Sequence, residues 1–171
     1  MILSLLKLQI SRSKLLETKE SLKVTESRIK SIANLYEMLL LNTEEINIET
    51  TNYLERIYQN IALNFQKDVK INYDIQYEIE LDSLIYVGLI FNELITNSFK
   101  YAFPNNKGEI WVILKQKDNQ IFLTIKDNGQ GFKERRKNSL GLTIVETLIK
   151  GQLLGTLNIN SHDGTEVSMV W

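Results

Sequence analysis

Apolar residues recur at helical spacing in the first quarter of the chain. They predict a short helix over residues 2–12 and a longer one over residues 20–42, with a polar turn between the two helices. The apolar positions are Ile2, Leu5, Leu6 and Ile10 in the first helix and Leu22, Ile29, Ile32, Ala33, Tyr36 and Leu40 in the second. Two helices cannot enclose two apolar stripes, so a four-helix bundle with the same hairpin of a second chain is the economical arrangement. The alternative is that both helices pack on the rest of the chain.

A polar segment from Asn42 to Asn47 marks the expected domain boundary. It separates a helical hairpin, residues 1–44, from a second domain, residues 45–171. The second domain opens with an amphipathic helix that extends to about residue 66, with Tyr53 at the edge of its apolar face. The positions on this face are Ile48, Thr51, Leu54, Ile57, Tyr58, Ile61 and Phe65.

Strand and turn signals dominate the remainder, where seven of the eight glycines follow Gly88. Strict alternation predicts a strand over residues 69–75, and a less regular pattern predicts another near 77–81. A helix is expected over residues 82–101, with Asp82 and Ser83 as candidate caps. Strands at 108–117 and 120–126, a helix at 142–150 and a closing hairpin at 155–160 and 165–170 complete the pattern.

Composition narrows the functional classes. The 171 residues are 43% apolar and 24% charged, which suffices for one core with an appendage. A net charge of −1 gives no electrostatic basis for binding nucleic acid or an anionic membrane. The absence of cysteine excludes disulfides, thiol catalysis and Cys-based zinc sites. The opening apolar run is interrupted by Lys7 and lacks both a signal-peptide cleavage site and the roughly 20 residues of a membrane span, so we expect a cytosolic piece without membrane contact.

The helix over residues 82–101 carries the first candidate chemistry. At helical spacing Glu93, Asn97 and Lys100 share one stripe, opposite a packing face that includes Phe91 and Ile95. Asparagine is unfavourable inside a helix, so its amide is expected to bind something, and an amide oxygen together with a triphosphate suits Mg²⁺. The alternative is an ordinary solvated face.

A second candidate lies where a strand ends. The period of two places Asp127 on the same face as Ile121, Leu123 and Ile125, so its carboxylate is expected to be buried and to have a hydrogen-bond donor. The glycines of the following segment, Asp127-Asn128-Gly129-Gln130-Gly131, would permit close backbone approach to a ligand, although the same motif can be only a tight turn.

The helix at 142–150 supplies a third candidate. Its first backbone N–H groups could meet phosphate, with Gly141 leaving room for the ligand. His162, the only histidine, lies in the closing turn and is expected to be solvated.

In order and spacing these motifs resemble the ATP-binding domain of sensor histidine kinases and their relatives with the Bergerat fold. The N box corresponds to residues 93–101, the two glycine boxes to residues 127–131 and 139–142, and the last motif to Gly164-Thr165. Residues 4–9 and 31–33 resemble the dimerisation domain of the subgroup in which a leucine-rich stretch follows the phosphoacceptor histidine.

The resemblance implies an α+β fold: a helical hairpin, half of a dimeric four-helix bundle, then a two-layer α/β sandwich with a mixed sheet covered on one face by three helices. It implies that Asn97 holds Mg²⁺, that Lys100 contacts phosphate and that Glu93 orients or deprotonates the attacking histidine. It also implies that Asp127 accepts a hydrogen bond from the adenine amino group and that Thr165 supports Asp127 through water. Tyr101 would line the nucleotide or, equally, pack in the core. The residues with implied ATP-binding roles are Tyr101, Asp127, Gly129, Gly131, Ser139, Gly141, Leu142 and Thr165.

The implied partners are a second copy of the chain and the receiver domain of a response regulator. The phosphoacceptor would lie about two helical turns before Met1, so this piece is expected to bind Mg-ATP without phosphorylating itself. Departures from the family pattern are Ser98, where alanine is common, and a short lid over residues 132–139. Two alternatives stay open: an ATPase or anti-sigma type serine kinase, against which the leucine-rich hairpin argues, and a non-catalytic nucleotide-sensing module.

Overall fold

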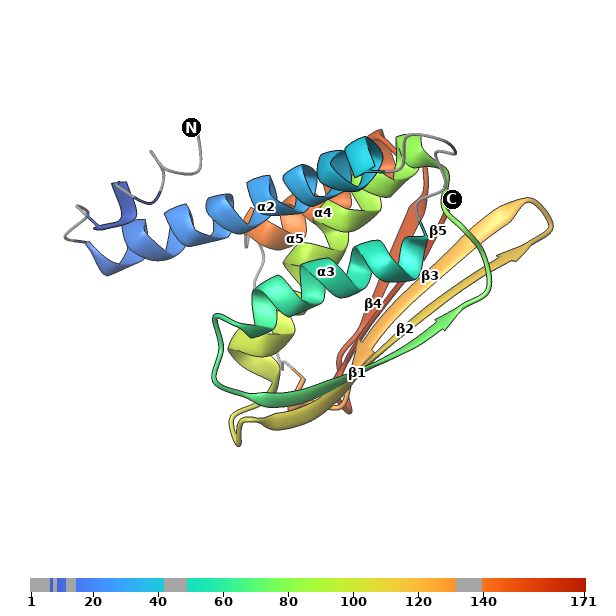
Figure 1. Cartoon of the computed structure of the whole chain (residues 1–171). Coiled ribbons are helices and arrows are strands. Elements are labelled where there is room, and N and C mark those ends of the chain that lie inside the picture. Colours follow the sequence, from blue (N-terminus) through green and yellow to red (C-terminus); the bar gives the residue numbers. More distant parts are fainter. Residues whose placement is uncertain (1–6, 8, 12–14, 42–48, 132–139) are drawn as a thin grey trace.

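A five-stranded mixed sheet forms the base of the second domain in the computed structural model, which describes residues 7, 9–11, 15–41, 49–131 and 140–171 (Figure 1). Its strands are β1 (Asp68–Ile75), β2 (Lys107–Lys117), β3 (Gln120–Asp127), β4 (Thr156–Asn160) and β5 (Thr165–Val170). They lie in the order β1-β2-β3-β5-β4, with β1 and β2 parallel and every other neighbouring pair antiparallel. The predicted mixed sheet is therefore confirmed.

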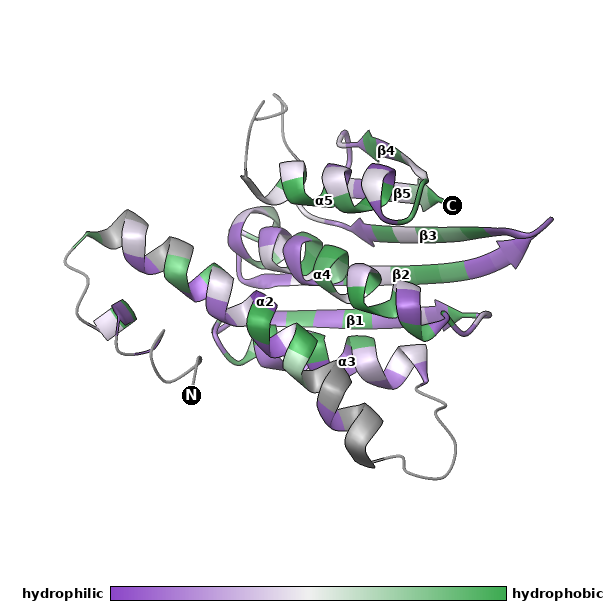
Figure 2. Cartoon of the chain, turned by 90° about the horizontal axis from the view of Figure 1, so that it is seen from above, coloured by the Kyte–Doolittle hydropathy of each residue, from purple (hydrophilic) through white to green (hydrophobic). Residues whose placement is uncertain are grey.

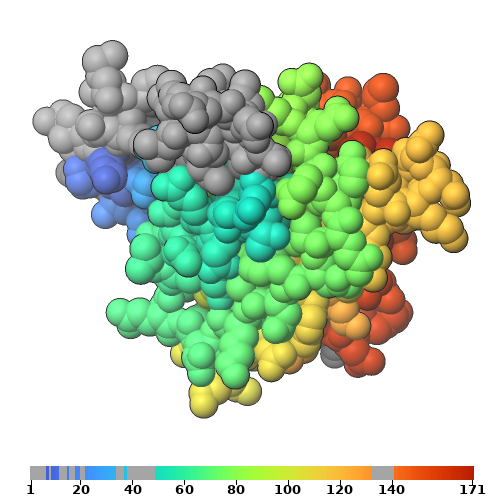
Figure 3. Space-filling model, turned by 45° about the vertical axis from the view of Figure 1, so that its right-hand side comes forward, coloured from blue at the N-terminus to red at the C-terminus, as the bar shows by residue number. Residues whose placement is uncertain are grey.

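The hairpin between β2 and β3 turns at Asp118 and Asn119, whose φ values of 50° and 60° suit a two-residue turn between twisted strands. Residues 115–120 are exposed, and this end of the hairpin projects from the molecule at the right of Figure 3.

Three helices cover one face of this sheet: α3 (Thr50–Ala62), α4 (Leu81–Asn97) and α5 (Leu140–Gly151). Seen from above in Figure 2, α3 lies on the side of β1, α5 on the side of β4, and α4 between them. A π-helix, η1 (Ser98–Ala102), continues α4 directly. The predicted two-layer arrangement is confirmed, and the single helix expected over residues 82–101 is an α-helix that ends in a π-helical turn.

Helix α2 (Leu16–Leu41) adds a third layer, because it packs across α3 and α4 on the side away from the sheet (Figures 1 and 2). The packing of α2 agrees with part of the alternative expectation, whereas the packing of the first helix and the four-helix bundle with a second chain stay predictions. Of the helix predicted over residues 2–12, the structure describes residues 7 and 9–11, which are helical. The predicted boundary at residues 44 and 45 lies outside the described residues. Within the described part, no helix is both long and apolar enough to cross a membrane.

The core lies between the sheet and the three helices. Its largest fully buried side chains come from α3, α4, η1, the residue after η1 and β2: Tyr53, Leu54, Ile57, Ile61, Leu84, Ile90, Phe91, Ile95, Phe99, Phe103, Ile110 and Leu114. Tyr53, expected at the edge of its helix, is fully buried because its ring packs over Gly88 of α4, where an added Cβ would lie 2.2 Å from the tyrosine oxygen.

Two local predictions were wrong. Residues 77–81 do not form a strand, because this segment bonds to the start of α3: the backbone N–H of Ile79 donates to Thr50 Oγ1 at 2.9 Å, and Glu78 Oε2 accepts from the backbone N–H of Thr50 at 2.6 Å. Neither Asp82 nor Ser83 caps α4, because the helix begins at Leu81 with Glu80 in the cap position and no side-chain capping bond.

Candidate functional site

Helix α4 is covered on both sides where the candidate residues begin. Its apolar face meets the core, and the opposite face meets α2, so Glu93 is only 4% exposed. The alternative of an ordinary solvated face is therefore wrong for this residue. Asn97, one turn later, is half-buried.

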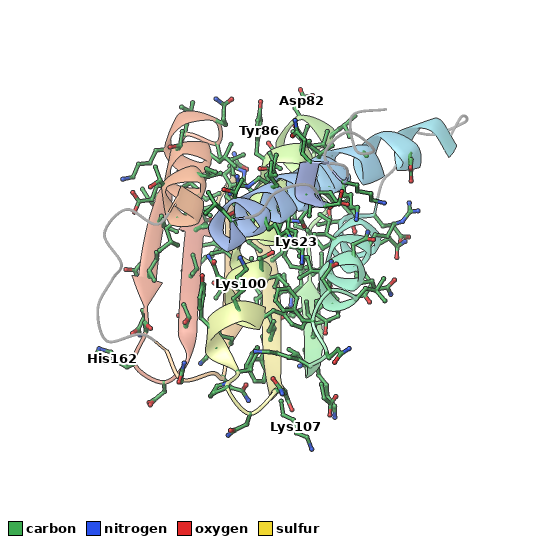
Figure 4. All side chains as sticks on the ribbon, turned by 90° about the vertical axis from the view of Figure 1, so that its left-hand side faces the viewer. Lys23, Asp82, Tyr86, Lys100, Lys107 and His162 are labelled. Carbon is green, nitrogen blue, oxygen red and sulfur yellow. The ribbon has the colours of Figure 1, made fainter. Side chains whose placement is uncertain are left out.

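The π-helical turn changes the placement of the residues after Asn97. It widens the helix at Ser98–Ala102, which includes Lys100 and Tyr101. Lys100 is half-buried and has no ion pair with any described residue, and Figure 4 places it below α2 near the end of α4. Tyr101 is 55% exposed, so the core-packing alternative for its ring was wrong.

Asp127, the last residue of β3, is a buried carboxylate with three protein donors. Its Oδ1 accepts from the backbone N–H groups of Gly129 at 3.0 Å and Thr165 at 3.1 Å, and its Oδ2 accepts from the Ser98 hydroxyl at 2.8 Å. The carboxylate is 3% exposed, as the strand period predicts. Two carboxylate oxygens offer about four acceptor positions, so one position on Oδ2 has no donor among the described residues and could accept from a further one.

The glycine segment after Asp127 is attached to η1. The backbone N–H of Gln130 donates to the Ala102 carbonyl at 3.0 Å, and the Gln130 side chain donates to the Tyr101 carbonyl at 2.8 Å. At Gly129 an added Cβ would lie 2.4 Å from Ala102 Cβ, so glycine is needed there for packing within the protein. Gly131 has φ +62°, a conformation that favours glycine.

The start of α5 faces α4. A Cβ added at Gly141 would lie 2.8 Å from Glu93 Oε2 and 3.7 Å from Asn97 Nδ2, so the backbone here lies directly against both side chains. The first described turn of α5, which begins at Leu140, therefore lies beside Glu93 and Asn97. Leu142 is half-buried against the core. Ser139 and the predicted short lid lie outside the described residues.

The turn between β4 and β5 closes the site from the other side. Gly164 has φ +85°, and an added Cβ would lie 1.9 Å from the Asp127 carbonyl, so this turn packs on the end of β3. Thr165 contacts Asp127 directly through its backbone N–H, whereas the water-mediated role of its side chain stays a prediction. His162 is exposed at the outer edge of this turn (Figure 4), as expected for a solvated residue.

Two partners of the candidate residues were not predicted from the sequence. Ser98 was identified only as a departure from the family pattern, yet it donates to Asp127. Arg28 of α2 forms an ion pair with Glu93, with 2.5 Å between Arg28 Nε and Glu93 Oε1. No local pattern could reveal this pair, because its members lie 65 positions apart. A polar Asn92-Glu93 pair within an apolar helix was the one available signal that something polar covers α4.

The described residues fit Mg²⁺ only together with a phosphate ligand. No group of three or more His, Cys, Asp or Glu side chains in the described part of the chain could hold a metal ion. Asn97 would supply one oxygen, and Mg²⁺ commonly takes its other ligands from phosphates and water. The first turn of α5 and the ammonium of Lys100 suit such a phosphate.

Family models match both parts of the chain. The model described as histidine kinase-, DNA gyrase B-, and HSP90-like ATPase matches residues 84–171, more than half of the chain, and a histidine kinase model matches residues 1–65. The first of these models implies an ATP-binding domain.

Two curated relatives are sensor proteins. The sensor histidine kinase PdtaS of Mycobacterium tuberculosis is 26% identical over 178 residues, which cover 97% of this chain and 35% of that protein. The sensor protein LytS of Bacillus cereus is 31% identical over 87 residues, which cover 50% of this chain and 15% of that protein. PdtaS thus matches almost the whole of this chain, but this chain spans only about a third of the length of PdtaS.

A solved structure shares the fold. It is the histidine kinase domain of the blue-light activated histidine kinase EL346 from Erythrobacter litoralis, with a TM-score of 0.74 and 24% identity over 99% of this chain and 85% of that chain. The chain therefore belongs to the sensor histidine kinases, of which it carries a dimerisation region and the ATP-binding domain shared with DNA gyrase B and HSP90.

Proposed function

We propose that this chain binds Mg-ATP between α4, α5 and the end of β3, and that it is the catalytic portion of a two-component sensor kinase. The observation that carries the proposal is Asp127, a buried carboxylate with three protein donors and one acceptor position left. An adenine amino group supplies a donor of the required kind. A buried acceptor that bonds an N–H of a ligand selects strongly against ligands without that N–H, because such ligands leave the acceptor unpaired.

The phosphates would lie toward Glu93 and the start of α5. Helix N-termini favour anions, and here Lys100 adds a positive charge without a protein partner in the described residues. Asn97 would hold Mg²⁺, which supplies charge neutralisation at the phosphates when bound. Gly129, Gly131, Gly141, Leu142 and Thr165 would line the nucleotide, with Tyr101 exposed at its border.

The reaction proposed for the complete kinase is phosphoryl transfer to a histidine upstream of this chain. An imidazole nitrogen attacks the γ-phosphorus, the bond to the β-phosphate oxygen breaks, and ADP leaves. Glu93 would orient the imidazole and accept its proton, since Glu93 Oε2 is directed toward the start of α5. The phosphoryl group would then pass to an aspartate of a response-regulator receiver domain. The match of a histidine kinase model to residues 1–65 supports this reaction over an ATPase or a serine kinase.

The homodimer is also a proposal. The predicted apolar stripe of α2 is not fully covered within one chain, because Leu22, Ile29, Ile32 and Ala33 are only half-buried, and Leu15 is 71% exposed. Pairing with a second hairpin would cover this surface. The division into residues 1–44 and 45–171 remains part of the same proposal.

Calorimetric titration of the chain with a non-hydrolysable ATP analogue, with and without Mg²⁺, tests the proposed function. We expect binding that is saturable and stronger with Mg²⁺. Adenosine should compete and guanosine should not, because guanine presents a carbonyl oxygen where adenine presents its amino group. Absence of binding, or equal competition by guanosine, would contradict the proposal.

A further inference from the structure

The contact between α2 and α4 is polar and buried, which is unusual for two packed helices. Asn92 Nδ2 donates to Ser27 Oγ and to Ser31 Oγ, each at 2.9 Å, and Tyr53 of α3 donates to the Ser31 carbonyl at 3.1 Å. Asn92 and Ser31 are each 1% exposed. These bonds hold one turn of α2 in a fixed position over Glu93.

Arg28 lies between Ser27 and Ser31 in the sequence of this turn, and its side chain reaches Glu93. The guanidinium bonds Glu93 Oε1 at 2.5 Å, and the two side chains are 19% and 5% exposed. A buried carboxylate requires a compensating charge or donors, and among the described residues Arg28 supplies the charge. The Arg28–Glu93 pair is therefore part of how α2 is attached to the second domain.

The two oxygens of Glu93 have different surroundings. Oε1 faces Arg28, whereas Oε2 lies 2.8 Å from the position of a Cβ on Gly141, at the start of α5 and near Asn97. Arg28 thus fixes the orientation of the carboxylate, with one oxygen on the guanidinium and the other facing the candidate phosphate region. A general base is commonly held in position in this way, because one of its atoms bonds a third group while the other faces the reacting group.

We propose that Arg28, supplied by the helical hairpin, is a positioning and charge-compensating residue of the nucleotide site. The inference rests on the proposed function, since it takes the phosphates to lie beside Glu93. A triphosphate next to an uncompensated buried carboxylate is repelled, and the guanidinium on the far side of that carboxylate removes most of this repulsion. Because binding effects are reciprocal, nucleotide would also hold α2 more firmly against α4.

The test is calorimetry with non-hydrolysable ATP analogue and with ADP on four variants. Arg28→Met should weaken binding of the ATP analogue by about tenfold or more and of ADP by less, because ADP carries less charge toward Glu93. Arg28→Lys should retain most of the affinity. Arg28→Met combined with Glu93→Gln should bind more tightly than Arg28→Met alone, because no carboxylate remains to be compensated, and Glu93→Gln alone completes the double-mutant cycle.

Arg56→Met is the matched control, since Arg56 is an exposed arginine on α3 and its removal should leave affinity unchanged. Thermal unfolding of each variant confirms that it is folded. Amide hydrogen exchange should become slower at residues 27–31 when the ATP analogue is added, and this slowing should be lost in Arg28→Met.

The outcomes separate this inference from the proposed function. If the unaltered chain binds no nucleotide, the proposed function fails. If it binds and Arg28→Met binds equally well, only the role of Arg28 is overturned. Equal weakening toward ATP analogue and ADP, without recovery in the double variant, would show that Arg28 is merely structural and would overturn the inference as well.

Discussion

Replacing Asp127 by asparagine should separate nucleotide binding from folding. Asparagine keeps the shape of the side chain, and its amide oxygen can still accept from the backbone N–H groups of Gly129 and Thr165. Its amide nitrogen replaces Oδ2, and the Ser98 hydroxyl can rotate to accept from it instead of donating. Every protein partner of Asp127 therefore keeps a hydrogen bond.

The expected loss of stability is small. Bonds to a charged acceptor are worth about 1.5–3 kcal/mol and neutral bonds about 0.5–1.5 kcal/mol, so three bonds become weaker. Burying a neutral amide in place of a carboxylate offsets part of this loss. We expect the free energy of unfolding to fall by about 1–2 kcal/mol. Asp127→Ala is less informative, because it leaves three buried donors unpaired at about 1–3 kcal/mol each, which approaches the whole stability of a domain.

The expected loss of affinity is large. The asparagine amide would direct its own N–H toward the adenine amino group, so a charged hydrogen bond is lost and two donors oppose each other. Together these effects should cost about 3–6 kcal/mol, which corresponds to at least about a hundredfold in Kd. Calorimetry with the ATP analogue measures the affinity, and urea denaturation measures the stability.

Ser98→Ala is the control for this experiment. It removes the donor to Oδ2 and should lower stability by about 1–2 kcal/mol, while the carboxylate remains to accept from the adenine. Nucleotide affinity within about threefold of normal for Asp127→Asn would refute the assignment of Asp127 to the adenine. A loss of affinity in Ser98→Ala as large as in Asp127→Asn would attribute the effect to disturbed packing.

Three further predictions follow from individual contacts. Gly129→Ala should reduce the free energy of unfolding by about 1–3 kcal/mol in urea, because the added Cβ would lie 2.4 Å from Ala102 Cβ, whereas Gly151→Ala, with no atom within 4 Å, should not. Burial raises the pKa of Tyr53, so at high pH the Tyr53 hydroxyl stays protonated in the folded chain and loses its proton in the unfolded chain. The free energy of unfolding should therefore fall as the pH rises above about 10, and it should fall less steeply in Tyr53→Phe. Removing Mg²⁺ with a chelator should weaken the ATP analogue by about tenfold or more and leave adenosine unaffected, and Asn97→Ala should abolish this dependence on Mg²⁺.

Local periodicity was enough to predict most of the sheet and its helices. The strand β3 could be placed because Leu123, Ile125 and Asp127 share one face, and the same phase placed the carboxylate at the buried end of an apolar row. The closing hairpin was likewise predicted to within a residue at each end, since alternating strands on either side of a glycine turn constrain its register.

The failures came from contacts between distant segments. Residues 77–81 have a partly alternating pattern, but the backbone N–H of Ile79 donates to Thr50 Oγ1 instead of to a neighbouring strand, and the Glu78 side chain accepts from the backbone N–H of Thr50. The π-helical turn at Ser98–Ala102 interrupts the helical spacing that grouped Lys100 with Glu93. The ion pair of Glu93 with Arg28 depends on how α2 crosses α4, and the polar Asn92-Glu93 pair indicates that something polar covers α4 without identifying Arg28.

A crystal structure of the chain with Mg²⁺ and a non-hydrolysable ATP analogue would show where the nucleotide lies. We expect the adenine amino group within hydrogen-bond distance of Asp127 Oδ2, the metal ion on Asn97 and the phosphates between Lys100 and the start of α5. Nucleotide bound elsewhere, or bound here with its adenine away from Asp127, would overturn the proposed site.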